Sequence, residues 1–142
     1  MTQPITTNIG RFPKHTFPRG IYTYTGSARG RSNNLYTRIG RHLRTEKKKW
    51  WHIDYLVSSK LVQIPAIVYY PTSLKSECNV AYRIEQLVET TSILKGFGSS
   101  DCTSGCTAHL HYFPRSMLYE ATTKVATIYN EIFFEAATVQ YT

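Results

Sequence analysis

The chain has 142 residues, 42% of them apolar, which is enough for one compact domain and too few for two comfortable ones. Its net charge is +8, and residues 1–60 hold all the excess, with 12 lysines and arginines against two acids. No apolar run approaches the roughly 20 residues of a membrane-spanning helix, and no signal peptide is recognisable. The sequence therefore predicts a cytoplasmic protein without a membrane partner.

The first regular element is expected after residue 20. Residues 1–19 lack a hydrophobic period, and their three prolines indicate turns or short edge strands. Residues 21–25 are β-branched or aromatic and lie between two glycines, which predicts a strand. After a turn at 26–30, a helix is expected, capped by one of the polar residues at 32–34. Its apolar positions are Leu35, Ile39 and Leu43.

The second half of the chain alternates strand and helix patterns. Residues 50–57 could form a short strand or a short helix, whereas Ile64–Tyr70 predicts a strand. A helix from about Leu74 to Thr91 follows, and a short strand is expected at His109–Phe113. Residues 115–142 could form helix, strand or both. The expected inward face of the helix comprises Leu74, Cys78, Ala81, Ile84 and Val88.

Four polar side chains near the first strand and helix could meet at one phosphate. Tyr22 and Tyr24 lie two residues apart, on one face of the strand. Arg38 and His42 lie at the border of the helix's apolar stripe. An arginine fork suits a phosphate, and a phenol beside cations can position or deprotonate a water. The alternative is a half-buried aromatic face beside a solvated helix face.

The positive charge of the first half is typical of a protein that binds a phosphate backbone. We expect nucleic acid, and DNA in particular, as the partner, with an anionic membrane or an acidic protein surface as the alternatives. The candidate phosphate contacts are Arg29, Arg31, Arg41, Arg44, Lys47, Lys48 and Lys49.

The chain has three cysteines, and this odd number argues against a disulfide framework. The spacing Cys-x₃-Cys-x₂-His at Cys102, Cys106 and His109 resembles part of a zinc site, which Cys78 would have to complete. Structural zinc is therefore one interpretation. Buried thiols beside a hydrogen-bonded histidine are the interpretation that the sequence favours.

Several motifs occur in an order that points to one family. They are YTGSA at Tyr24–Ala28, RIGRHL at Arg38–Leu43, WHIDYL at Trp51–Leu56, SEC at Ser76–Cys78, GFGSSDC at Gly96–Cys102 and HLHYF at His109–Phe113. Over about residues 5–113, this pattern resembles an uncharacterised prokaryotic family, domain of unknown function 123. That family has a domain similar to the GIY-YIG nucleases, and its members are sometimes attached to DNA-repair glycosylases.

The resemblance implies an α/β (α+β) fold with a small mixed or antiparallel sheet of three to four strands flanked by helices. We expect residues 1–114 to form this GIY-YIG-like domain and residues 115–142 to pack on it as a C-terminal extension. The nucleases carry about ten residues between the two halves of their motif, whereas one residue separates Gly20–Tyr22 from Tyr24. The resemblance therefore places the first strand of the family near or before Met1.

The resemblance also implies a set of site residues. Tyr24, Arg38 and His42 would be catalytic, with Tyr22 as a further candidate, and Glu77 would bind Mg²⁺ or Mn²⁺. Without a metal, an acid in the first turn of a helix still stabilises the helix dipole.

The expected function is a metal-dependent endonuclease that hydrolyses phosphodiester bonds. The alternatives are a non-catalytic nucleic-acid-binding module with a degenerate nuclease site and an interaction domain for an acidic protein. A DNA-repair protein is a further expected partner, and the sequence gives no oligomeric state.

Overall fold

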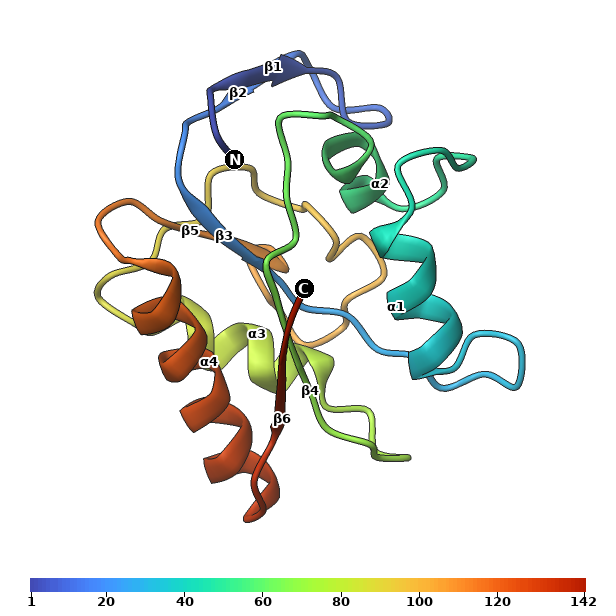
Figure 1. The fold of residues 1–142 in the computed structure, drawn as a ribbon, viewed down its shortest axis with the longest axis vertical. Coiled ribbons are helices and arrows are strands. Elements are labelled where there is room, and N and C mark those ends of the chain that lie inside the picture. The colour runs from blue at the N-terminus through green and yellow to red at the C-terminus, as the bar shows by residue number, and fades with distance from the viewer.

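The computed structural model describes residues 1–142 and contains four helices and six short strands. In chain order the elements are β1 (Ile5–Thr7), β2 (His15–Phe17), β3 (Ile21–Tyr24), α1 (Leu35–Leu43), α2 (His52–Val57), β4 (Ala66–Tyr69), α3 (Glu77–Glu85), β5 (Leu110–Phe113), α4 (Leu118–Phe133) and β6 (Thr138–Tyr141). The strands form three antiparallel pairs, β1–β2, β3–β5 and β4–β6, as Figure 1 shows. The predicted α/β fold class is confirmed, with the strands divided among these pairs.

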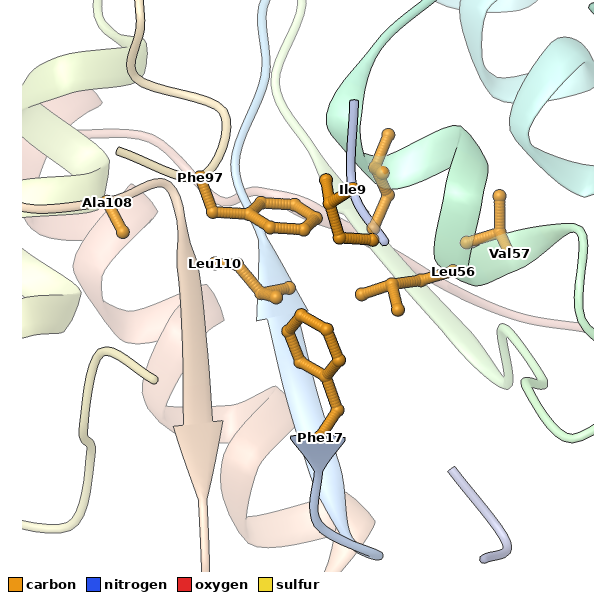
Figure 2. Close-up of a cluster of buried hydrophobic side chains, with 8 residues drawn as sticks. Ile9, Phe17, Leu56, Val57, Phe97, Ala108 and Leu110 are labelled. Atoms are coloured by element: carbon orange, nitrogen blue, oxygen red, sulfur yellow. The ribbon is translucent and has the colours of Figure 1, made fainter. Parts of the chain in front are cut away.

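One core cluster lies between the N-terminal strands, α2 and the start of β5. Phe17, Leu56 and Phe97 are fully buried there and surround Leu110, as Figure 2 shows. A second cluster joins α3, α4 and the end of β5, where Phe113 packs against both helices. Successive side chains of a strand point to opposite faces, so Leu110 and Phe113 supply one core cluster each.

The two helices of the basic half follow from local signals. The side chain of Asn34 accepts a hydrogen bond from the Thr37 N–H at 3.0 Å and caps α1 as expected. Within the ambiguous residues 50–57, His52–Val57 form α2, because Ile53, Leu56 and Val57 recur at helical spacing and are buried together.

Helix α3 is shorter than the predicted helix from Leu74 to Thr91. Leu74 and Val88, which were expected on its inward face, are 65% and 95% exposed. The hydroxyl of Thr90 donates to the Ile84 carbonyl at 2.8 Å, so a side chain replaces a continuing helical turn there. The predicted burial of Cys78, Ala81 and Ile84 is confirmed.

Residues 115–142 contain both a helix and a strand. Helix α4 packs on α3 and β4, and β6 pairs with β4 at the centre of Figure 1. None of the helices has the length and apolar character needed to cross a membrane.

Candidate functional site

A cleft of about 590 Å³ lies between the end of β3, α1, β4 and the start of α3. Its lining includes Tyr24, Arg38, His42 and Glu77. These residues come from three elements that are far apart in sequence. The fold therefore brings together four of the residues that the sequence analysis placed in one site.

Arg38 extends from α1 into this cleft between an aromatic ring and a glycine. Its guanidinium carbon lies 4.4 Å from the centre of the Trp51 ring, within cation–π range. A Cβ atom at Gly26 would lie only 3.0 Å from an Arg38 Nη atom, so this glycine leaves room for the guanidinium. Arg38 takes part in none of the ion pairs of the protein, and its charge remains available to an anionic ligand.

Tyr24 is the phenol of the cleft. Burial raises its pKa, whereas the charge of Arg38 and a hydrogen bond from Arg38 lower it. The backbone of Gly98 packs against the ring, since a Cβ at this position would lie 2.7 Å from Tyr24 Cε2. Tyr24 thus stays protonated at neutral pH, and Arg38 is the group that would favour loss of its proton.

Tyr22 faces a different environment, although it lies on the same strand. Its hydroxyl donates to the Pro18 carbonyl at 2.8 Å, and its ring packs on Tyr112 with centroids 4.7 Å apart. It lines an adjoining, mainly apolar cavity of about 680 Å³, which shares Tyr24 and His42 with the cleft, and it does not line the cleft itself. The structure therefore places one of the two candidate tyrosines in the cleft.

His42 lies at the inner wall of the cleft as a neutral imidazole. Neither ring nitrogen has a hydrogen-bond partner. Burial, together with the positive charges of Arg38 and Lys47, lowers its pKa to about 4. Its ring is edge-on to Tyr24, with centroids 6.1 Å apart. At neutral pH it offers an unused nitrogen lone pair beside the phenol.

Glu77 is the first residue of α3 and the only acid among the residues that line the cleft. It is partly buried, and its charge contributes to raising the pKa of Tyr24. Magnesium takes oxygen ligands and usually keeps several waters. One carboxylate is therefore a sufficient protein ligand only where a substrate phosphate supplies further oxygens.

The basic segment packs on a buried carboxylate, Asp54, whose partners the sequence analysis did not identify. It accepts hydrogen bonds from Arg41 at 2.7 Å and from the N–H groups of Trp50 and Trp51 at 3.0 Å each. Lys47 lies 3.8 Å from the same carboxylate. Arg41 and Lys47, two of the candidate phosphate contacts, thus point inward. One feature of the sequence could have indicated this role: Asp54 is one of only two acids among residues 1–60, where it is surrounded by lysines and arginines.

The other five candidate phosphate contacts are exposed. Arg29 lines the rim of the cleft, and the remaining four precede α1 or follow its C-terminal end. We call these five residues the basic surface. They are Arg29, Arg31, Arg44, Lys48 and Lys49.

A cluster of four metal-ligating side chains lies beside the cleft. Cys78, Cys102, Cys106 and His109 place one donor atom each within 4.8 Å of one another. The Cys78 sulfur lies 3.4 Å from that of Cys102 and 3.8 Å from His109 Nε2. All three cysteines are free thiols. This Cys₃His cluster could hold a metal ion, and Cys78 completes the set that the local spacing left unfinished.

The protonation properties of the cluster suit a cation. Burial raises the pKa of the Cys102 thiol, but the N–H groups of Cys106 and Ser104 outweigh it and lower the pKa to about 7. Burial and the neighbouring sulfurs raise the pKa of Cys106 to about 12. Burial also lowers the pKa of His109, which keeps it neutral. A bound cation would favour all three thiolates and the neutral imidazole.

The cluster supports both walls of the cleft. Cys78 directly follows Glu77 in the first turn of α3. The carbonyl of His109 accepts a hydrogen bond from the N–H of Thr25 at 2.9 Å, and Thr25 directly follows Tyr24. The Cys₃His cluster is therefore directly connected to the segments that carry Tyr24 and Glu77.

No curated protein and no solved structure matches the chain. One family profile does match, over residues 1–131, and its description is Domain of unknown function DUF123. Since this match spans most of the chain, the protein belongs to the DUF123 family.

Proposed function

We propose that this protein processes nucleic acid at the cleft and is related to the GIY-YIG nucleases. The observation that carries the proposal is the meeting of Tyr24, Arg38, His42 and Glu77 at one cleft. The basic surface adjoins this cleft and would hold the phosphate backbone. DNA is the expected form of the substrate.

The roles follow from the chemistry of each group. Arg38 would bind the scissile phosphate and stabilise the charge that develops on it. Tyr24 would position the attacking water, and the free nitrogen of His42 would accept a hydrogen bond from that water or from the phenol. Glu77 would hold Mg²⁺ or Mn²⁺, which supplies Lewis-acid stabilisation when bound.

A binding module with a degenerate nuclease site is the second candidate. Two observations favour it: the cleft has a single carboxylate, and Tyr22 is directed away from it. Binding and cleavage must therefore be measured separately.

The first prediction concerns binding. We expect the protein to bind DNA with an affinity that falls steeply with salt, because each phosphate that a lysine or arginine neutralises releases counterions. For duplex DNA, the slope of log K against log[salt] is negative, and its magnitude should decrease by about 0.9 for each protein cation that no longer contacts a phosphate. The double variant R44Q/K48Q should therefore reduce this magnitude by about 1.8. Fluorescence anisotropy at several salt concentrations measures it.

The matched control removes one arginine and one lysine, both exposed, from the other half of the chain. K95Q/R115Q changes the net charge equally and should leave the slope close to that of the wild type. Equal slopes for the two double variants would contradict the placement of nucleic acid on the basic surface. Absence of binding at low salt would contradict the proposed function as a whole.

The second prediction concerns cleavage of branched, nicked and single-stranded DNA with Mg²⁺ or Mn²⁺. Arg38→Ala should lower the rate on the order of 10²–10³-fold, as expected for loss of a donor to the transition state. Glu77→Gln should abolish the cleavage that requires Mg²⁺ or Mn²⁺, because the protein ligand of the metal is lost. Binding should change much less, because the basic surface remains intact.

Tyr22→Phe is the control for Tyr24→Phe, since of the two residues only Tyr24 lines the cleft and the Tyr22 hydroxyl bonds to the Pro18 carbonyl. Only Tyr24→Phe should slow cleavage. Cleavage that survives both Arg38→Ala and Glu77→Gln would show that the activity resides elsewhere. Binding without cleavage by the wild type would select the degenerate module.

For the Cys₃His cluster, we propose a structural zinc ion. A tetrahedral zinc site with Zn–S of about 2.3 Å and Zn–N of about 2.0 Å has donor-to-donor distances of about 3.5–3.8 Å. Tetrahedral geometry gives about 3.8 Å between two sulfurs and about 3.5 Å between a sulfur and a nitrogen. In the cluster, the Cys78 and Cys102 sulfurs lie 3.4 Å apart, and the Cys78 sulfur lies 3.8 Å from His109 Nε2. All four donor atoms lie within 4.8 Å of one another, so small side-chain shifts would complete the tetrahedron. Four protein ligands leave no open position, which is typical of structural sites. Mg²⁺ and Mn²⁺ prefer oxygen ligands and suit the cleft instead.

A further inference from the structure

Trp50 is a large apolar side chain that the fold holds at the surface. Its side chain is 66% exposed, although its backbone N–H donates to the buried Asp54 carboxylate at 3.0 Å. Its ring meets that of Trp51 edge-on, with centroids 6.5 Å apart. The backbone of Trp50 is therefore anchored while the indole remains accessible to a ligand.

Positive charges surround this indole. The Arg41 guanidinium lies 5.3 Å from the ring centre and is itself fixed by Asp54. The Lys48 ammonium lies 5.8 Å from the ring centre and is exposed. An accessible ring stacks on a nucleobase, and cations beside it pair with the phosphates that flank that base.

A second exposed aromatic ring lies at the other end of α1. Tyr36 is 88% exposed and lines the rim of the cleft. At 1.5 Å per residue, the helix places its two ends about 12 Å apart. Aromatic rings thus flank α1 at both ends, and exposed cations precede and follow it.

We infer that this surface binds single-stranded nucleic acid, with one unpaired base stacked on Trp50 and a second on Tyr36. We call it the stacking surface, and it consists of Tyr36, Arg44, Lys48, Lys49 and Trp50. The inference rests on the proposed function, since both place the phosphate backbone along α1. It adds the substrate class, because the faces of bases inside a duplex are covered by their neighbours and cannot stack on an indole.

The experiment compares three fluorescein-labelled oligonucleotides of equal length: a single strand, the same strand with abasic sites, and the duplex. Anisotropy titrations at one salt concentration separate base stacking from phosphate pairing, because the abasic strand keeps its phosphates. We expect the single strand to bind most tightly. Trp50→Ala should weaken single-strand binding about 5- to 150-fold, the range given by stacking of one base.

Further measurements test the roles of the Trp50 and Tyr36 rings. Trp50→Phe should retain most of the affinity, and Trp50→Ala should leave binding of the abasic strand unchanged. Tyr36→Ala should also weaken single-strand binding, whereas Tyr119→Ala, at another exposed tyrosine, should not. Tryptophan fluorescence should be quenched by the single strand in the wild type and much less in Trp50→Phe. A Tm close to that of the wild type would show that each variant is folded.

The outcomes separate this inference from the proposed function. Equal affinity for single strand and duplex, with no effect of Trp50→Ala, would overturn the stacking surface while leaving phosphate binding in place. Competition by poly-glutamate that depends on Trp50 would assign the surface to an acidic protein instead and also overturn the inference. Failure to bind any of the three oligonucleotides at low salt would overturn both proposals.

Discussion

Cys106→Ser is expected to remove most of the stability that a zinc ion in the Cys₃His cluster would supply. A structural zinc site contributes its binding free energy to folding, and this amounts to about 10–16 kcal/mol in zinc-finger peptides. A typical domain has a total stability of only about 5–15 kcal/mol. The Cys₃His cluster joins α3 to the segment before β5, so loss of the metal should release both from the core.

The measurements are the zinc content of the purified protein and its thermal unfolding with and without a chelator. The wild type should carry one zinc ion per chain, and chelation should lower its Tm. Replacement by Co²⁺ should give the absorption bands of a tetrahedral site with thiolate ligands. A wild-type protein without zinc, whose Tm responds to neither zinc nor chelator, would contradict a structural metal.

Two histidines provide a matched comparison for this prediction. His109 belongs to the cluster, whereas His111 lies two residues away, is equally buried and does not belong to it. His109→Asn should lower the zinc content, and His111→Asn should leave one zinc ion per chain even if it lowers the Tm. Equal zinc content in both variants would exclude His109 as a ligand.

Asp54→Ala is expected to cost about 3–5 kcal/mol of unfolding free energy, the usual effect of removing one partner of a buried ion pair. The carboxylate binds Arg41 and the N–H groups of Trp50 and Trp51, and all three would lose their partner. Asp54→Asn should cost less, because an amide oxygen can still accept from the backbone. Urea unfolding measures both, with Glu46→Gln, an exposed acid in the same segment, as the control.

The same carboxylate predicts a pH dependence. Burial would raise the pKa of Asp54, but the N–H groups of Trp50 and Trp51 and the charge of Arg41 hold it below its ordinary value of 3.8. The folded state therefore binds this proton less readily than the unfolded state. The stabilisation is complete above pH 3.8 and is lost as the pH falls through the lower folded pKa. Asp54→Asn should flatten the acid limb of stability, and an unchanged limb would contradict this role.

Local patterns in the sequence identified most of the elements. The period of Leu35, Ile39 and Leu43, with Asn34 as the cap, was sufficient for α1. The aromatic and β-branched residues at 21–25 predicted β3, which spans Ile21–Tyr24. These signals are reliable because helix caps and strand alternation depend on residues close in sequence. The predicted length of α3 was wrong. Whether its ends are buried depends on packing partners elsewhere in the fold, which the local sequence does not reveal.

The candidate site, like the fold, was predictable in part from local motifs and in part not. The motifs around Tyr24, Arg38, His42 and Glu77 were sufficient to name four residues that the fold places at one cleft. The orientation of Tyr22 could not be predicted, because it depends on the partner that its hydroxyl finds at Pro18.

The sequence by itself determined the fold class, the basic first half and the two groups of candidate site residues. Only the tertiary structure decided that Cys78 joins a cluster whose nearest other ligand in the chain is 24 residues away. It also decided that Arg41 and Lys47 point inward, since the fully buried Asp54 requires cationic partners. Both have the same physical reason. A buried polar group needs a hydrogen-bond, ionic or metal partner, and tertiary packing supplies that partner from a distant part of the chain, so spacing along the sequence does not reveal it.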